Sequence, residues 1–375
     1  MLNGALLAID EVNADDTYDF ALAPNFVDPT GKLADYRRTC EHMLKHEGIQ
    51  HIIGCYTSSS RKEVIPCFEK YDGLLWYPSH YEGFETSSNV IYTGAAPNQH
   101  IVPLAKFMMK AHGKRAFCVG SNYIWAWENN RIMREILTAN GGEIVSEKYV
   151  PVGSQDVEHL IDDIVRHHPD FIFSTLIGDS RYAFVKAYQK LGEKTPAFQA
   201  DRMPITDCSL SEPELLRIGP DASPGLIASS VYFQSIGSDR NDQFIASYQA
   251  RFGAHTVTCA DAEASYISVL LLANAIQRAG TTGIDAIRHA AMGSSIDAPQ
   301  GRVTIDVDNA HCYMTPRLAR ARDDRRFEIF NEAPEPVKPD PYLVWLDPVL
   351  EGKGANANHA GSKAPEIRSK LRLVK

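Results

Sequence analysis

The chain has 375 residues, 44% of them hydrophobic and 23% charged, which is enough for two ordinary domains with apolar cores. Its formal net charge of −9 at pH 7 repels phosphate backbones and excludes direct nucleic-acid binding as a main function. No run of about 18 apolar residues occurs, so the sequence predicts no membrane span. The seven cysteines are scattered without a CxxC pair, which favours reduced thiols over disulfides or a zinc site.

Short apolar segments alternate with longer amphipathic ones over the first part of the chain. Segments rich in Val, Ile and aromatic residues predict strands at 51–55, 73–76, 90–93, 116–120, 143–149, 171–175 and 225–231. Helical periodicity lies between them, at 35–46, 62–71, 103–112, 128–140, 156–167 and 181–191. This alternation predicts an α/β protein with parallel sheets covered by helices on both faces.

The alternation changes from residue 239 onward. Helices are predicted at 239–252, 260–279 and 284–292, and short strands at 302–307 and 325–330. The segment after Glu332 is rich in Pro and then in Gly, Ala, Lys and Asn, a composition that predicts a disordered tail.

The motifs of common enzymes are absent from the sequence. There is no GxGxxG, GxxxxGK[ST], GxSxG or HExxH pattern and no EF-hand loop. His42 and His46 have a metal-binding spacing without a third ligand nearby, so a solvated helix face is the favoured interpretation. Cys55 follows an apolar strand, where a thiol more often fills a core than attacks a substrate. We therefore expect a binding protein without cofactor or metal, and not an enzyme.

Predicted strands run into polar loops that open a helix at three places. These loops are rich in hydroxyls and aromatic rings: GCYTSSS at 54–60, WYPSHYEGF at 76–84 and GSNYIWAWE at 120–128. In open parallel sheets, ligands bind beyond the carboxyl ends of strands, where such loops lie. Hydroxyls and free N–H groups at a helix start bind acceptor oxygens, and Tyr and Trp provide flat apolar walls. The mixture suits a small neutral ligand such as an amide or urea; helix caps and core aromatics are the structural alternative.

The same loops carry a resemblance to a known family. Together with APNQ at 96–99, DAPQG at 297–301 and KPDPY at 338–342, they resemble the amide- and urea-type solute-binding proteins, most closely the amide-sensing negative regulators of aliphatic amidase operons. The resemblance implies the type I periplasmic-binding-protein fold, with two doubly wound parallel-sheet lobes and a ligand cleft between them. Lobe one would be 1–93 plus 232–299, lobe two 94–231 plus 300–335, and 336–375 would be a C-terminal extension.

The resemblance also implies which residues line the ligand pocket. The expected contacts on the first lobe are Tyr56, Ser58, Tyr77, Ser79 and His80. Those on the second lobe are Tyr123 and Trp125, and Tyr232 at the second crossover is a further candidate. Ser58 would hydrogen-bond the ligand carbonyl or amide, while Ser60 would cap the following helix. Two residues depart from the family pattern and put the identity of the ligand in question: Trp125 replaces a usual tyrosine, and His80 replaces a proline.

A further departure concerns the beginning of the chain. Family members start with a strand that is central in the sheet of lobe one, before the helix that here starts near Met1. We therefore expect a lobe that lacks its first strand, with neighbouring strands left unpaired. The segment at Met1 also lacks the basic and apolar regions of a secretory signal. We expect a cytoplasmic protein as the sequence starts, and a periplasmic one if a signal peptide precedes it.

Two functions fit this resemblance, and a third is weaker. In the main hypothesis the lobes close on a short aliphatic amide or urea-like compound, and the protein regulates amide or nitrile metabolism through an RNA-binding antitermination partner. The alternative is the substrate-binding component of an ABC transporter for amides, urea or branched-chain amino acids, with a permease as partner. An amidase that uses Cys55 or Ser58 would lack an assigned base. A homo-oligomer is compatible with either main function.

Overall fold

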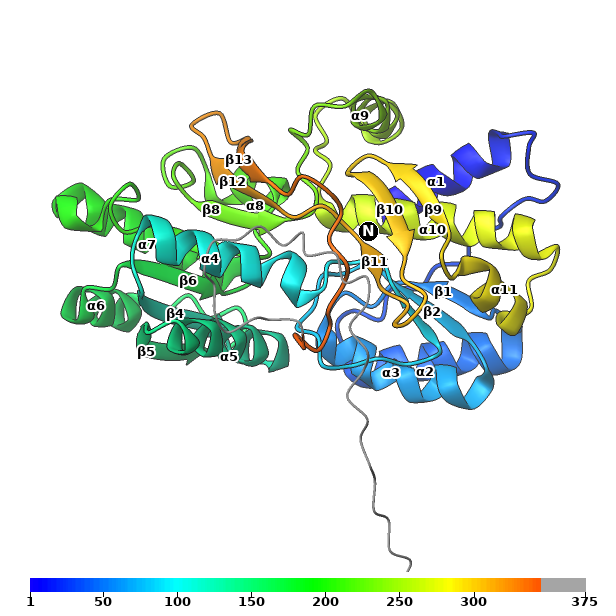
Figure 1. The fold of residues 1–375 in the computed structure, drawn as a ribbon, viewed down its shortest axis with the longest axis horizontal. Helices are drawn as coiled ribbons and strands as arrows, with labels where there is room; N and C mark the ends of the chain where they lie inside the picture. The colour runs from blue at the N-terminus through cyan, green and yellow to red at the C-terminus, as the bar shows by residue number, and fades with distance from the viewer. Residues whose placement is uncertain (345–375) are drawn as a thin grey trace, which may run out of the picture.

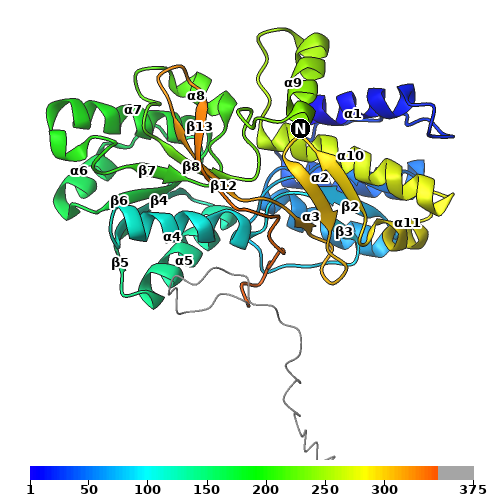
Figure 2. The same ribbon diagram turned by 45° about the horizontal axis from the view of Figure 1, so that its top comes forward.

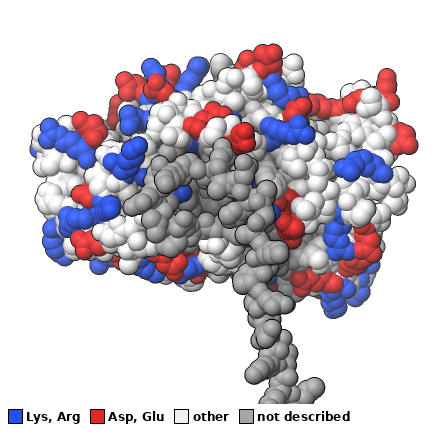
Figure 3. All heavy atoms as spheres, in the orientation of Figure 1, with Lys and Arg blue, Asp and Glu red and all other residues white. Residues whose placement is uncertain are grey.

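Two groups of mainly parallel strands, each with helices on both faces, form two lobes that lie side by side (Figure 1). The computed structural model describes residues 1–344, and the account below concerns these residues. On the face seen in Figure 3, basic and acidic side chains are mixed over both lobes. The described residues visible on this face therefore form no broad basic surface of the kind that binds phosphate backbones.

Lobe one is built on a parallel sheet of order β1-β2-β3, formed by β1 (His51–Ile53), β2 (Leu74–Tyr77) and β3 (Val90–Tyr92). Leu74 and Trp76 pack into the core on one face of this sheet, and Leu75 and Tyr77 into the core on the other. The strand is thus buried on both faces, as expected of a parallel sheet between helix layers. The helices of this lobe are α1 (Leu2–Ala14), α2 (Leu33–His42), α3 (Ser58–Tyr71), α9 (Asp239–Phe252), α10 (Ala260–Ala279) and α11 (Ile284–Ala291).

Lobe two is built on a seven-stranded sheet of order β13-β12-β8-β7-β6-β4-β5. Its parallel strands are β4 (Arg115–Ser121), β5 (Glu143–Val150), β6 (Phe171–Thr175), β7 (Ile205–Asp207) and β8 (Ile227–Ser230). Two antiparallel strands complete one edge, β12 (Arg317–Ala321) and β13 (Phe327–Glu332). The helices are α4 (Ile101–Ala111), α5 (Ile124–Ala139), α6 (Glu158–His167), α7 (Gly178–Lys194) and α8 (Glu212–Ile218).

Each strand and helix expected from the sequence has a counterpart in the structure. Three of them have the expected bounds (171–175, 239–252 and 260–279), and the others have shifted ends. Residues 205–207, 295–298, 312–313 and 317–321 form strands that were not predicted from the sequence, and α8 was also missed. The helix after β1 starts earlier than expected. Ser60 is therefore not its cap; the hydroxyl of Thr57 caps the helix by accepting the backbone N–H of Ser60 at 3.2 Å.

The structure moves one expected lobe boundary. A small antiparallel sheet of β9 (Ser295–Ala298), β10 (Gly301–Ile305) and β11 (Cys312–Tyr313) lies on lobe one, beside α10 (Figure 2). The expected division between residues 299 and 300 cuts the turn between β9 and β10, which pair from Gly301 opposite Ala298 onward. Because β9 and β10 are hydrogen-bonded in one sheet, both belong to lobe one. The chain crosses back to lobe two only after β11.

The sheet of lobe one ends at β1. Among residues 1–344 only β2 pairs with this strand, so β1 is an edge strand there, as the resemblance predicts for a lobe without its first strand. The described chain between α1 and α2 forms no strand, and Phe26 and Val27 in this segment are 66% and 53% exposed. Leu22 is held by the Asn13 amide, which accepts the Leu22 N–H at 2.7 Å and donates to its carbonyl at 2.9 Å.

The segment that follows β13 is ordered up to the last described residue. Val337 donates its N–H to the Met314 carbonyl at 2.8 Å, and Phe84 donates to the Pro341 carbonyl at 2.8 Å. The Asn98 amide donates to the Lys338 carbonyl at 2.8 Å. The expectation of disorder directly after Glu332 is therefore wrong for residues 333–344. The rest of the expected extension, 345–375, lies outside the described residues.

The side chain of Arg317 contacts several of the segments where the chain passes between the lobes. Its guanidinium is 4% exposed and donates to the Val231 carbonyl at 2.5 Å, just after β8. It also donates to the Gln300 carbonyl at 2.9 Å, at the β9–β10 turn, and pairs with Glu332 at 2.9 Å. Loss of this side chain would leave buried carbonyl groups without a donor.

We predict that Arg317→Met lowers the free energy of unfolding by about 2–4 kcal/mol, because the lost donors leave buried carbonyls unpaired. Arg322→Met, which removes only a partly exposed pair with Glu328 at 3.4 Å, is the control and should change stability by less than about 0.5 kcal/mol. Urea denaturation of both variants measures the effect. Equal losses would contradict the assigned role of Arg317.

Candidate ligand-binding site between the lobes

A cavity lies between the lobes, where strand ends from both sheets meet. Its walls are Tyr56, Thr57, Ser58, Ser79, His80, Tyr123, Trp125, Ile177 and Ser209. The lobe-one residues follow β1 and β2, and the lobe-two residues follow β4, β6 and β7. The site therefore occupies the position where parallel sheets most often bind ligands, beyond the carboxyl ends of their strands.

The structure brings together most of the residues expected at the pocket. Tyr56, Ser58, Ser79, His80, Tyr123 and Trp125 all line this one cavity. Two further candidates lie elsewhere. Tyr77 packs inside lobe one and donates its hydroxyl to the Tyr56 carbonyl at 3.2 Å, so it supports the wall from behind. Tyr232 lies in the core, where Thr258 and Asn241 satisfy its hydroxyl at 2.7 and 2.9 Å.

Three lining residues were not singled out from the sequence. Thr57 was read only as part of a serine-rich loop, and its hydroxyl caps α3. Ile177 follows β6, whose carboxyl end carries the same signal as the other strand ends, so this residue could have been found. Ser209 follows β7, a strand of three residues, which is too short for a periodicity to reveal.

The loop that carries Tyr56 and Ser58 leaves β1 through an unusual backbone conformation. Gly54 has φ +155° and Cys55 has φ +68°, a left-handed value that is uncommon for a residue with a side chain. This turn directs residues 56–58 to the cavity and starts α3 at Ser58. Backbone strain of this kind often marks functional loops.

His80 lies at the centre of the site in an uncharged form. Burial, and then the Arg181 guanidinium, lower the pKa of its imidazole to about 4. Its ring packs edge-on against those of Trp125 and His100, with centroids 5.6 and 5.9 Å apart. At neutral pH this side chain therefore presents one donor and one acceptor without a charge.

The wall from lobe two is held by a buried ion cluster around Arg181. The guanidinium Nε lies 3.2 Å from Asp207 and donates to the Leu176 carbonyl at 2.9 Å. Arg181 also donates to the Ser209 hydroxyl, which in turn donates to Asp207 at 2.9 Å. These contacts fix the loops after β6 and β7, which carry Ile177 and Ser209.

The cavity is small in this conformation. It holds about 20 Å³ of space into which the centre of a water molecule fits, and an adjoining cavity that shares His80 holds a further 20 Å³ or so. Asp261 lines the adjoining cavity, and burial raises the pKa of its carboxyl to about 6. Space on the scale of one or two water molecules suits a ligand of few atoms, unless the lobes move apart.

Neither a metal-binding cluster nor an activated Cys55 thiol is found among the described residues. Within residues 1–344, no group of three or more His, Cys, Asp or Glu side chains could hold a metal ion. Burial raises the pKa of Cys55 to about 12, so its thiol stays protonated and is a poor nucleophile. None of the helices in this part of the chain combines the length and apolar character that crossing a bilayer requires.

Fold and site together define a two-lobed α/β protein with a pocket at its strand ends. The chain belongs to the periplasmic binding protein family: the family described as "Periplasmic binding protein domain" matches residues 1–348. The fold is the type I periplasmic-binding-protein fold. A relative from Brucella abortus (strain 2308), called Leu/Ile/Val-binding protein homolog 6, is 22% identical over 291 residues, which cover 76% of this chain and 73% of the relative.

Solved structures share the fold over most of its length. A solute-binding protein of an ABC transporter from Rhodopseudomonas palustris HaA2, in complex with p-hydroxybenzoic acid, has a TM-score of 0.78 and 21% identity, covering 92% of this chain and 95% of that one. A branched-chain amino acid ABC transporter periplasmic ligand-binding protein from Burkholderia xenovorans LB400 has a TM-score of 0.76 and 14% identity, covering 89% and 90%. At this identity, the likeness establishes the fold alone.

We predict that wild-type protein loses stability relative to a His80→Gln variant as the pH falls from about 7 to about 5. The unfolded His80 binds a proton below pH 6.5, whereas the folded one does so only near pH 4, so acid favours the unfolded wild-type chain. Urea denaturation of both proteins at the two pH values gives the difference in their free energies of unfolding. The pH dependence of this difference reports on His80, because the other titrating groups are common to both proteins. A difference that stays constant with pH would contradict the burial of a neutral His80.

Proposed function

We propose that the protein is the solute-binding component of an ABC importer, that it works outside the cytoplasm with a permease as partner, and that it takes a small polar solute. The amide, urea and branched-chain amino acid classes remain the proposed ligands. The observation that carries the proposal is the cavity whose walls come from strand-end loops of both lobes. A ligand held by both lobes binds the closed form better than the open one, which is how such proteins signal occupancy.

The comparisons support transport over regulation. The similar proteins bear the names of solute-binding components of ABC transporters or of a Leu/Ile/Val-binding homologue. The amide-sensing regulator, the main hypothesis from the sequence, has no support among them. We therefore prefer the importer component and keep the regulator as the outcome that the uptake experiment below would reveal.

The indole N–H of Trp125 favours a ligand that accepts a hydrogen bond. Its side chain lines the cavity and is 4% exposed, and its indole N–H has no acceptor within the described residues. A buried donor without a partner costs about 1–3 kcal/mol, so a ligand oxygen that reaches it gains affinity. The tryptophan that departs from the family pattern thus retains a polar function.

The chemistry of the site supports binding without turnover. Ser58 donates its proton to Glu82 at 2.5 Å, and Glu82 is itself paired with Arg61 at 3.0 Å. A carboxylate paired with an arginine does not provide the free base that activates a serine nucleophile, so Ser58 is not activated. Incubation with an amide is expected to leave the amide intact.

We predict that calorimetric titration with acetamide, butyramide, urea and leucine detects binding of at least one solute at one site per chain. Ser58→Ala should weaken that binding by about 1–3 kcal/mol, because the ligand loses a buried polar partner. Ser59→Ala, which alters the neighbouring hydroxyl outside the cavity wall, is the matched control. The proposal fails if no solute binds at millimolar concentration.

The uptake of a radiolabelled solute separates the two functions. Cells that lack the chain should take up the bound solute more slowly at low external concentration, with amidase expression unchanged. Unchanged uptake together with altered amidase expression would instead favour the regulator.

A further inference from the structure

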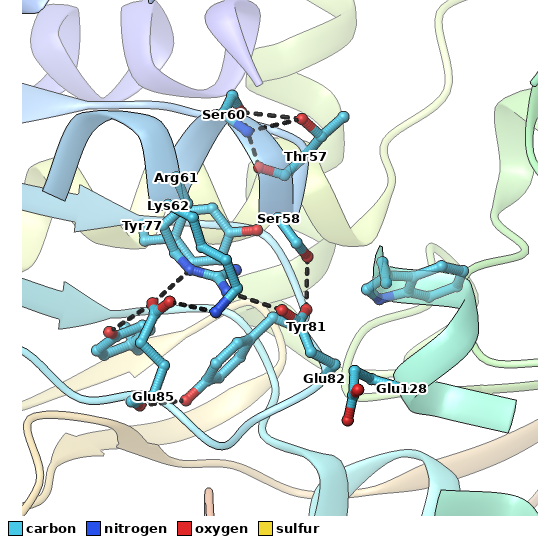
Figure 4. A network of polar contacts seen from close by, with 12 residues as sticks. Thr57, Ser58, Ser60, Arg61, Lys62, Tyr77, Tyr81, Glu82, Glu85 and Glu128 are labelled. Atoms are coloured by element: carbon cyan, nitrogen blue, oxygen red, sulfur yellow. Dashed lines mark hydrogen bonds and ion pairs between the residues drawn. The ribbon is translucent and has the colours of Figure 1, made fainter. Parts of the chain in front are cut away.

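A row of buried polar contacts leads from the cavity into lobe one (Figure 4). It starts at Ser58, passes through Glu82 and ends at Arg61, which also pairs with Glu85. Ser58, Glu82 and Arg61 are 2%, 1% and 0% exposed. Water therefore does not compete for these hydrogen bonds, and their directions are fixed.

Arg61 determines the orientation of Glu82. The guanidinium donates to one oxygen of Glu82 at 3.0 Å and to Glu85 at 2.7 Å, and the rings of Tyr77 and Tyr81 lie 4.7 and 4.6 Å from its central carbon. An arginine only donates hydrogen bonds. One carboxylate oxygen of Glu82 is therefore committed to Arg61, and the other faces Ser58.

Glu82 in turn fixes the polarity of Ser58. An ion-paired carboxylate only accepts hydrogen bonds, so the Ser58 hydroxyl must donate its single proton to Glu82, over 2.5 Å. The lone pairs of the Ser58 oxygen are left for the cavity that this residue lines. A ligand atom that contacts this oxygen must bring its own proton.

Next to the acceptor oxygen of Ser58, the start of α3 provides hydrogen-bond donors for a ligand. Ser58 is the first residue of α3, and the first N–H groups of a helix have no acceptor within that helix. The backbone there can donate to a carbonyl oxygen, while the hydroxyl oxygen accepts an N–H. A carboxylate ligand would have no proton for Ser58 and would face the negative charge of Glu82 behind it.

We propose that Glu82 is a specificity-determining positioning residue, which makes Ser58 a hydrogen-bond acceptor and so selects ligands that present an N–H group: a primary amide, a urea or an ammonium. Carboxylates that lack such a group are rejected. This inference rests on the proposed solute-binding function and deepens it, because it names the chemical group that the first-lobe wall recognises.

Glu82→Gln provides a direct test through an inversion of polarity. Arg61 can only donate, so the glutamine must turn its oxygen to Arg61 and its NH₂ group to Ser58. Ser58 then accepts from the glutamine, and its own proton becomes free for the ligand. Glu85→Gln removes the same kind of charge beside Arg61 without a contact to Ser58, and serves as the matched control.

The experiment measures affinity for two pairs of solutes that differ in the N–H group: acetamide with acetate, and leucine with 4-methylpentanoate. Wild-type protein should prefer the N–H member of the pair that binds by roughly a hundredfold or more. Glu82→Gln should reduce this preference by about tenfold or more, and Glu85→Gln should leave it unchanged, even where both variants lose stability in thermal denaturation.

Four outcomes would overturn the inference. Wild-type protein that binds acetate or 4-methylpentanoate as well as the N–H solute contradicts it even if Glu82→Gln does not fold. A preference that survives in Glu82→Gln, or that Glu85→Gln reduces equally, contradicts it while the solute-binding function stands. Absence of binding by wild-type protein to acetamide, leucine, butyramide and urea alike overturns this inference together with the proposed function.

Discussion

The buried positive charge of Arg61 is the constraint on which the first-lobe wall of the pocket depends. A guanidinium that is 0% exposed requires carboxylate partners, and the loop after β2 supplies Glu82 and Glu85. That loop also carries Ser79 and His80, so the pairing that neutralises the arginine brings two lining residues to the cavity. The same pairing decides which way the hydroxyl of Ser58 points.

Lobe two also contains a buried arginine, Arg181, that is neutralised by a carboxylate next to the cavity. Arg181 is the fourth residue of α7, as Arg61 is the fourth of α3. Arg61 pairs with Glu82 beyond the end of β2, and Arg181 pairs with Asp207, the last residue of β7. In both lobes a serine of the cavity wall donates its proton to that carboxylate: Ser58 to Glu82, and Ser209 to Asp207. The strand-end loops are thus anchored by buried charge, which holds the polar groups of the site in fixed directions before any ligand arrives.

The sequence predicts the β-α alternation and the strand-end loops because these features are local, whereas the two lobes and the eight pocket residues were implied by the resemblance. Six of those eight residues line one cavity, and all six lie in segments that follow strand ends. Tyr77 and Tyr232 were expected there too, but their direction depends on partners farther along the chain, such as Thr258 for Tyr232. The hydrogen bond between Ser58 and Glu82 joins residues 24 positions apart, and no sequence periodicity predicts it. Which partner Ser58 donates its proton to is therefore known only from the structure.

The most direct test of the account is a high-resolution structure of the protein with acetamide or leucine bound. The account predicts the solute between the lobes, with a nitrogen about 3 Å from the Ser58 hydroxyl oxygen, an oxygen near the first N–H groups of α3 or the Trp125 indole, and His80 beside it. A solute bound outside this cavity, or one that turns a carboxylate oxygen to Ser58 while Glu82 stays paired with Arg61, would contradict it.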